Sequence, residues 1–213
     1  MRNLVVGSFV SMDGVMQGPG GPDEDRDGGF DLGGWTVNYW DQMMGEVMDG
    51  QTSRSDGLLL GRRTYEIFAS YWPHAGDEDP TAAQLNNVRK YVATRTLDKV
   101  EWNNSTILEG DVAEAVARIK EEPGGEIHVT GSCNLIQTLL RHDLVDRFVL
   151  WIFPVVLGTG KRLFGEGAVP VGFTCVDTKV STTGVIIATY EKAGPIELGS
   201  FALEDQESIG SSA

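Results

Sequence analysis

Twice in this chain, an apolar run of strand length meets a glycine and passes directly into a helical pattern. The first instance is LLLGRRTYEIF at 58–68, and the second is IHVTGSCNLIQ at 127–137. Strands that alternate with helices in this way form parallel sheets, because each helix carries the chain back to the end where the previous strand began. The middle of the chain is therefore predicted to be an α/β structure.

The C-terminal part has strand patterns with no helix between them. DRFVLWIFPVVLG at 146–158 is one long apolar strand, and VGFTCVDTKVSTTGVIIATYEK at 171–192 indicates two strands joined by a turn at TTG. The predicted fold is a three-layer α/β structure whose central sheet is mainly parallel, with an antiparallel hairpin on its C-terminal side. We expect one domain over residues 1–203 and a flexible, polar tail at 204–213.

A long segment after the first strand has the composition of a loop. Residues 17–34, the acidic loop, are rich in glycine and aspartate and cannot build a core. Loops of this length in compact domains are either disordered inserts or flaps over a site. A helix is predicted next, at 35–50, where apolar residues recur at helical spacing up to a glycine.

The charge of the chain excludes several classes of partner. With 17 Lys and Arg against 31 Asp and Glu, the formal net charge is −14, which disfavours nucleic acid and anionic membranes. No window approaches the roughly 18 apolar residues of a membrane span, and no cleavable signal pattern opens the chain. Cys133 and Cys175 lack the spacing of a metal site. We expect a cytoplasmic protein without a metal.

Two adjacent arginines stand out in so acidic a chain. Gly61 and Thr64 bracket Arg62 and Arg63 where a predicted strand enters a helix. The free N–H groups and the dipole at a helix start favour a bound anion there, and a phosphate would explain the arginines. The alternative is a plain tight turn with two solvated surface arginines.

Another strand end offers the same chemistry. Thr94 and Thr96 flank Arg95, and two hydroxyls with one guanidinium suit a phosphate monoester. In open α/β sheets ligands lie beyond the carboxyl ends of the strands, where these turns are predicted to be. Several anionic contacts favour a dinucleotide with an extra ribose phosphate, so NADPH is expected rather than NADH. The turns do not contain the GxGxxG fingerprint.

Candidates for proton transfer are few. Asp13 lies at the end of the first strand and Glu46 on the helix predicted at 35–50, and either carboxyl is a possible donor. A turn aspartate and a solvated helix glutamate are the more common explanations. Hydride transfer requires mainly that cofactor and substrate are oriented, so the absence of a nucleophile motif is consistent with it.

Several of these motifs, in this order, resemble the dihydrofolate reductase-like superfamily, and more closely the C-terminal reductase domain of the bifunctional riboflavin biosynthesis deaminase-reductase. The resemblance extends from about residue 2 to 193 and is carried by SMDG, LLLGRRTYEIFASYW, KYVATRTL, IHVTGSCNLIQTLLRHDLVD and PVVLGTGKRLF. It implies a mainly parallel sheet with an antiparallel C-terminal strand. Members of the riboflavin branch are commonly homodimers.

The resemblance also implies where a cofactor lies. The turns matching Gly61–Thr64 and Thr94–Thr96 hold the phosphates of NADPH in that family. A third turn covers the pyrophosphate and consists here of Gly131, Ser132, Cys133, Asn134 and Leu135. The end of the first strand and the following loop lie against the nicotinamide, which implicates Phe9, Val10, Met16 and Gln17.

The resemblance suggests a small-molecule substrate as well. The riboflavin-branch enzyme reduces the ribose of a phosphorylated aminouracil and is normally fused to a deaminase domain, whose HxE and PCxxC zinc pattern is absent here. A stand-alone 5-amino-6-(5-phosphoribosylamino)uracil reductase-like enzyme is therefore expected. The alternatives are a genuine dihydrofolate reductase and a non-catalytic NADPH-binding protein.

The substrate pocket depends on how the predicted helix at 35–50 is placed. Gln17, Trp35 and Tyr39 would line that pocket if this helix lies over the nicotinamide. An aromatic stripe at this spacing is more often part of a core. The acidic loop would disfavour a phosphorylated substrate if it folds over the site, whereas a solvated flap would not.

Overall fold

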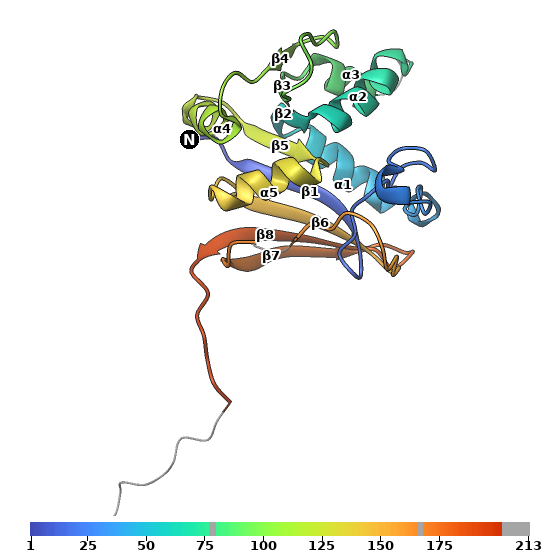
Figure 1. Cartoon of the computed structure of the whole chain (residues 1–213). Coiled ribbons are helices and arrows are strands. Elements are labelled where there is room, and N and C mark those ends of the chain that lie inside the picture. The colour runs from blue at the N-terminus through green and yellow to red at the C-terminus, as the bar shows by residue number, and fades with distance from the viewer. Residues whose placement is uncertain (77–79, 166–167, 202–213) are drawn as a thin grey trace, which may run out of the picture.

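An eight-stranded sheet lies between two layers of helices in the computed structural model, which describes residues 1–76, 80–165 and 168–201 (Figure 1). In chain order the strands are β1 (Leu4–Ser11), β2 (Ser55–Gly61), β3 (Lys90–Ala93), β4 (Ser105–Ile107), β5 (Glu126–Thr130), β6 (Arg147–Phe153), β7 (Gly172–Val180) and β8 (Ile186–Gly194). Across the sheet their order is β4-β3-β2-β5-β1-β6-β8-β7.

The pairing of the strands confirms the predicted fold. Every neighbouring pair from β4 to β6 is parallel, whereas β8 runs antiparallel to both β6 and β7. The sheet is therefore mainly parallel and ends in the antiparallel hairpin expected around TTG.

Helices cover both faces of the sheet. They are α1 (Gln42–Thr52), α2 (Arg62–Tyr71), α3 (Pro80–Asn87), α4 (Val112–Glu121) and α5 (Cys133–Arg141), with short 3-10 turns at Asp27–Gly29, Val37–Tyr39 and Trp72–His74. Leu59 of β2 belongs to the core formed with α4 and α5, whereas Leu58 and Leu60 belong to a core formed with α2 and α3. A strand covered on both sides is apolar throughout, which explains the LLL run.

The helix predicted at 35–50 is shorter than expected. α1 begins only at Gln42, because Asp41 is extended and its side chain accepts the N–H of Met44 at 2.9 Å. The same carboxylate also accepts the N–H of Thr182 at 2.8 Å. An N-cap tied to the β7–β8 turn in this way fixes where the helix starts.

The C-terminal segment leaves the sheet after β8. After β8, residues 195–201 extend away from the body of the molecule (Figure 1). The tail predicted at 204–213 lies outside the described residues. Among the helices that the structure describes, none is long and apolar enough to cross a membrane.

Candidate functional site

The predicted turns lie along one edge of the sheet. They follow β3, β2 and β5, which are consecutive neighbours, and β1 comes next to β5. Because these strands are parallel, their carboxyl ends share one edge, where ligands of α/β sheets bind. Thr94–Thr96, Gly61–Thr64 and Gly131–Leu135 are thus brought together in this order, with the loop after β1 beside them.

Two of these turns touch each other directly. The Oγ of Ser132 accepts the N–H of Gly61 at 2.8 Å and lies 2.7 Å from the Oγ1 of Thr64. A Cβ on Gly61 would lie 2.7 Å from that Oγ, and one on Gly131, whose φ is +62°, would lie 3.1 Å from the Oγ1 of Thr64. Both glycines are therefore required by the close approach of the turns.

The helices that directly follow these two turns have open N-termini. α2 follows Gly61 and α5 follows Ser132, and in the described residues neither start has a side-chain cap or an acidic residue in its first turn. By contrast, α1 is capped by Asp41 and α4 by Asp111. The uncapped N–H groups and the positive ends of α2 and α5 are suited to an anion.

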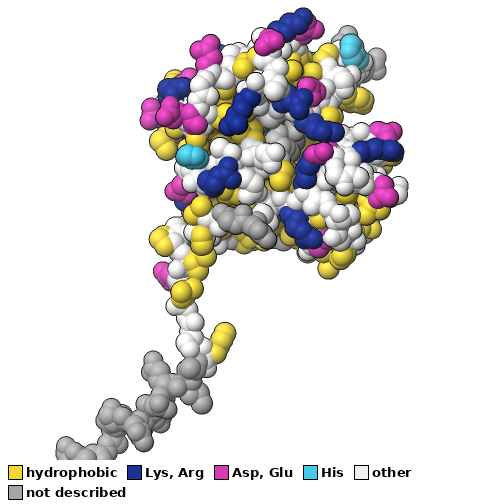
Figure 2. All heavy atoms as spheres, viewed as in Figure 1, with side chains coloured by type: hydrophobic (Ala, Val, Ile, Leu, Met, Phe, Trp, Pro, Cys, Tyr) yellow, Lys and Arg dark blue, Asp and Glu magenta, His cyan; other side chains and the backbone are white. Residues whose placement is uncertain are grey.

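The three predicted arginines differ in their contacts. Arg62 forms an ion pair with Glu66 at 3.2 Å, and Arg63 forms one with Asp25 of the acidic loop at 3.3 Å. Arg95 is exposed and has no ion pair within the described part of the chain. The Arg62–Glu66 pair is half-exposed on both sides and contributes little to stability, so Arg62 can exchange its partner at low cost. On the face seen in Figure 2, Lys and Arg side chains gather around the middle with Asp and Glu between them.

The turn after β3 is shaped by its first threonine. The Oγ1 of Thr94 accepts the N–H groups of Thr96 and Leu97, both at 3.1 Å. This hydroxyl therefore holds the turn, while the side chains of Arg95 and Thr96 are exposed at the edge.

The rest of the third turn is divided between surface and core. Asn134 is exposed, whereas Leu135 is buried in the core under α5. The Sγ of Cys133 donates to the carbonyl of Arg162 at 3.1 Å, and burial raises the pKa of this thiol. A protonated thiol fits a packing role.

The residues predicted to face a nicotinamide are largely packed. Val10 and Met16 are buried in the core with α4 and α5. Phe9 lies on the other side of the sheet, edge-on to Trp151 and Phe153, with ring centroids 5.4 and 5.5 Å away. The side chains of Val10 and Met16 are thus committed to the core, and Phe9 is the least enclosed of the three.

Gln17 is the centre around which the acidic loop folds. Its Nε2 donates to the carbonyls of Asp25 at 3.1 Å and Asp27 at 2.9 Å, and its Oε1 accepts the N–H of Lys161 at 2.9 Å. Its own carbonyl accepts the indole N–H of Trp35 at 2.8 Å. Gln17 is 4% exposed, so its side chain organises the loop from inside rather than facing a ligand.

Two cations of this edge were not predicted from the sequence. Lys161 pairs with Asp25 at 2.8 Å and with Asp27 at 2.9 Å, and Asp25 in turn pairs with Arg63. Arg162 follows in the same loop after β6. The sequence feature that could have identified them is GKR in PVVLGTGKRLF, where a glycine precedes two cations as in GRR. The acidic loop is therefore closed onto the edge by ion pairs.

Asp13, a candidate proton donor, is held as a carboxylate. It accepts from the Oγ of Ser11 at 2.7 Å and from the N–H groups of Leu157 at 3.0 Å and Gly158 at 2.9 Å. Arg162 lies 3.4 Å from the same carboxylate. The bond from Ser11, followed by those from the backbone, lowers the pKa of Asp13 to about 2. At neutral pH this group is ionised and joins the loop after β1 to the loop after β6.

The remaining candidates lie around α1. Glu46 is exposed on this helix and accepts from the Nε2 of Gln42 at 2.9 Å. Trp35 and Tyr39 are half-buried and lie edge-on to Phe153, at 5.3 and 5.9 Å between ring centroids. The aromatic stripe is thus partly core, packed against the end of β6.

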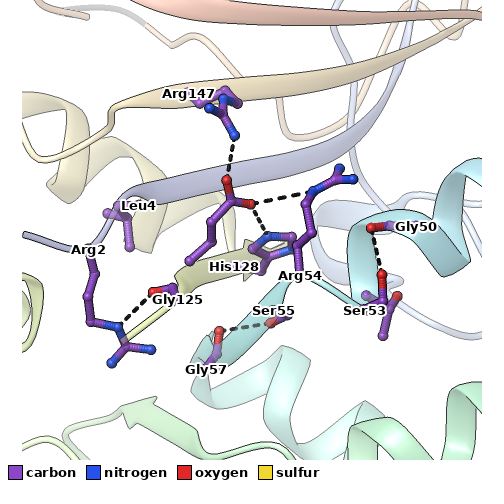
Figure 3. A network of polar contacts seen from close by, with 12 residues as sticks. Arg2, Leu4, Gly50, Ser53, Arg54, Ser55, Gly57, Gly125, His128 and Arg147 are labelled. Atoms are coloured by element: carbon purple, nitrogen blue, oxygen red, sulfur yellow. Dashed lines mark hydrogen bonds and ion pairs between the residues drawn. The ribbon is translucent and has the colours of Figure 1, made fainter. Parts of the chain in front are cut away.

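A separate polar cluster occupies the opposite edge of the sheet. The carboxylate of Glu126, at the start of β5, contacts Arg147 at 2.5 Å, His128 at 3.0 Å and Arg54 at 4.0 Å (Figure 3). Burial lowers the pKa of His128. The hydrogen bond to Glu126 acts to raise this pKa, but burial has the larger effect. Burial acts to raise the pKa of Glu126, but His128 and Arg147 together lower it. The cluster lies at the amino ends of the strands, away from the candidate site.

Solved structures share this architecture. A putative riboflavin biosynthesis protein from Shewanella sp. PV-4 matches with a TM-score of 0.69 and 23% identity, over 90% of this chain and 99% of that one. A pyrimidine reductase-like protein from Corynebacterium diphtheriae matches with a TM-score of 0.63 and 11% identity, over 90% and 92%. Dihydrofolate reductase from Enterococcus faecalis, complexed with NADP(H) and RAB-propyl, matches with a TM-score of 0.56 and 14% identity, over 89% of this chain and 96% of that one. These likenesses establish a dihydrofolate reductase-like fold.

Sequence relatives cover nearly the whole chain. The uncharacterized protein YyaP of Bacillus subtilis (strain 168) is 28% identical over 198 residues, which are 91% of this chain and 96% of YyaP. The uncharacterized protein YwjB of the same strain is 27% identical over 168 residues, 78% and 84% of the two chains. The family model described as "RibD C-terminal domain" matches residues 2–187. The chain therefore belongs to the RibD C-terminal domain family.

Proposed function

We propose that this protein is an NADPH-dependent reductase. The observation that carries the proposal is the pair of uncapped helix starts, those of α2 and α5, which are locked together through Ser132 at the carboxyl edge of the sheet. Two positive helix ends held at a fixed separation suit a ligand with linked phosphates. Membership of the RibD C-terminal domain family supports the same conclusion.

The residues at this edge fit such a cofactor. Gly61 and Gly131 let the two turns approach closely enough for Ser132 to contact Thr64, which holds the uncapped starts of α2 and α5 next to each other for linked phosphates. Arg95, exposed and unpaired among the described residues, supplies a guanidinium for the extra ribose phosphate that distinguishes NADPH from NADH. Arg62 is half-exposed and supplies a second one. NADPH, when bound, supplies the hydride.

The hydride acceptor would lie beside the end of β1, next to α1. We propose a ribosylaminouracil-type or related small heterocyclic substrate, because the family and the Shewanella and Corynebacterium structures are named for riboflavin biosynthesis and pyrimidine reduction. Trp35 and Tyr39 are half-buried and lie edge-on to Phe153, which pairs with Ser11 at the end of β1. Such rings pack against a planar heterocycle.

The acidic side chains of α1 argue against dihydrofolate. Dihydrofolate reductases use an acidic residue on the corresponding helix to bind the pterin. Here both oxygens of Asp41 are occupied, one by Met44 and the other by Thr182, and Glu46 is exposed on the helix surface. Asp41 would have to give up these contacts to bind a pterin ring, and Glu46 lies exposed beside Gln42.

Loss of NADPH absorbance with a panel of substrates tests the function. We expect oxidation with 5-amino-6-(5-phosphoribosylamino)uracil or its dephosphorylated form and none above background with dihydrofolate. Turnover of dihydrofolate would contradict the substrate assignment. Tight binding of NADPH without oxidation by any member of the panel would instead identify a non-catalytic binding protein.

A further inference from the structure

A cavity separate from the candidate site lies at the amino ends of the strands. Its volume is about 580 Å³, and it is lined by residues at the end of α3, the starts of β2 and β3 and the end of α4. Sites for small molecules in proteins span roughly 300–1,000 Å³. The candidate cofactor turns follow the carboxyl ends of the same strands, so this cavity is not part of that site.

Arg2 is a buried cation in the lining of this cavity. It is 4% exposed, its Nε donates to the carbonyl of Gly125 at 2.9 Å, and its Nη2 lies 3.2 Å from Asp56 (Figure 3). A Cβ on Gly57 would lie 3.2 Å from this Nη2, and one on Gly124 would lie 3.1 Å from the Nε. Glycines on two sides thus leave room for the guanidinium, which its contacts hold in one position.

The hydroxyl of Tyr91 contacts two guanidinium groups in the same cavity. It accepts from the Nη1 of Arg2 and from the Nη1 of Arg89, each at 3.4 Å. These contacts are longer than the usual range of about 2.7–3.2 Å and are therefore weak. Tyr91 is 6% exposed, and its own O–H proton meets no acceptor within the described residues. A carboxylate would accept this proton together with N–H groups of both arginines.

The cavity also contains charges of both signs that lack a partner. Arg89 and Glu122 are exposed in its lining, and neither forms an ion pair in the part of the chain that the structure describes. Asp56 meets Arg2 and the N–H of Gly125 through one oxygen, and its other oxygen has no partner among those residues. A simple anion would face the two carboxylates, and a simple cation would face the two guanidinium groups. A molecule that carries both charges matches both.

We propose that this cavity binds a small zwitterion, an amino acid or a molecule of similar size with one carboxylate and one ammonium group. The carboxylate contacts Arg2, Arg89 and the O–H of Tyr91. The ammonium group contacts Glu122 and the free oxygen of Asp56. Among the described residues no group of His, Cys, Asp and Glu side chains is suited to a metal ion, so the carboxylates here are not a metal site.

Calorimetric titration of the full chain with blocked and unblocked amino acids tests both charges. The probes are the free L-amino acids, their N-acetyl derivatives, which lack the ammonium group, and their C-terminal amides, which lack the carboxylate. We expect the free form of the best-bound amino acid to bind about tenfold more tightly than either derivative, the effect of one lost charge-assisted contact. Inorganic phosphate, the probe for a simple anion, should bind more weakly than the amino acid.

Two variants assign each charge of the ligand to its partner. Arg89→Gln should weaken binding of the free amino acid about tenfold and leave binding of its amide unchanged, because the amide has no carboxylate to lose a contact. Glu122→Gln should weaken the free amino acid similarly and leave its N-acetyl derivative unchanged. Arg118→Gln and Glu121→Gln change exposed residues of α4 outside the lining, and both should bind as the wild type does.

Several results would overturn the proposal. They are no binding of any amino acid, equal affinity for free and blocked forms, phosphate bound as tightly as the amino acid, full affinity in both Arg89→Gln and Glu122→Gln, and equal losses in the control variants. NADPH titration of the same variants keeps the two proposals apart, since the cavity and the cofactor turns lie at opposite edges of the sheet and the affinity for NADPH should not change.

Discussion

Ser132 joins the start of α5 to the start of α2, because its Oγ lies 2.7 Å from the Oγ1 of Thr64. The same oxygen accepts the N–H of Gly61 at 2.8 Å. Ser132 is in the left-handed region, with φ +68°, and this conformation turns its side chain back onto the neighbouring helix instead of capping its own. The arrangement of the two proposed phosphate turns therefore depends on one hydroxyl.

Removing this hydroxyl is expected to separate the turns. Ser132→Ala leaves the N–H of Gly61 without its acceptor, which should lower the free energy of unfolding by about 1–2 kcal/mol and weaken NADPH binding. Denaturant unfolding and cofactor titration measure the two effects. The control is Ser105→Ala, since the buried Oγ of Ser105 has no hydrogen-bond partner in the described residues and its loss should cost nothing. Equal losses of stability in both variants would refute the role of Ser132.

The acidic loop should open when its buried ion pair is removed. Asp25 is 14% exposed and contacts both Lys161 and Arg63, so Asp25→Asn is expected to lower the free energy of unfolding. The loss should be about 1 kcal/mol, between the values for exposed and fully buried pairs. Limited proteolysis of the loop should become faster as well.

Another aspartate of the same loop provides a matched control. Asp23 pairs with Arg26, and their side chains are 83% and 66% exposed, so Asp23→Asn should change neither stability nor proteolysis. If Asp23→Asn accelerated cleavage as much as Asp25→Asn, closure of the loop through Lys161 would be wrong.

The layers of the fold were predictable from the sequence because they depend on local patterns. LLLG and IHVTG are continuous or alternating apolar runs next to amphipathic helices, and the structure confirms a strand at each of them. The start of α1 was not predictable, since it depends on a contact between Asp41 and Thr182, 141 residues apart.

The turns of the candidate site were predictable from the sequence, because glycines and strand ends mark them. The contacts between side chains of different loops were less predictable. The packing of Gln17 and the ionised state of Asp13 depend on the loop after β6, which closes on both residues from far along the chain. Lys161 enters the edge through the same loop and was missed for that reason.

The cluster around Glu126 should make stability depend on pH. Burial lowers the pKa of His128 below the 6.5 of a free imidazole, so the unfolded chain binds this proton more readily than the folded one. The contribution of His128 to the free energy of unfolding is then fully present above pH 6.5. It declines as the pH falls toward the lowered pKa, by at most about 1.4 kcal/mol per pH unit. The lowered pKa of Glu126 adds a loss below its ordinary value of 4.5.

Denaturant unfolding at a series of pH values measures this dependence. His128→Gln should remove the part that begins near pH 6.5. His142→Gln, at the exposed C-cap of α5, should keep the wild-type profile. A profile unchanged by His128→Gln would show that this imidazole does not cause the decline.

The most direct test of the account is the affinity for NADPH of the wild type and of Arg62→Ala and Arg95→Ala, measured by fluorescence or calorimetric titration. Each variant should bind NADPH about tenfold more weakly, the effect of one lost charge-assisted contact. Arg141→Ala, which removes an exposed arginine at the far end of α5, should bind as the wild type does. Arg95→Ala should affect NADH much less than NADPH. If NADPH binds with the same affinity to the wild type and to both variants, or does not bind at all, the proposed cofactor site is wrong.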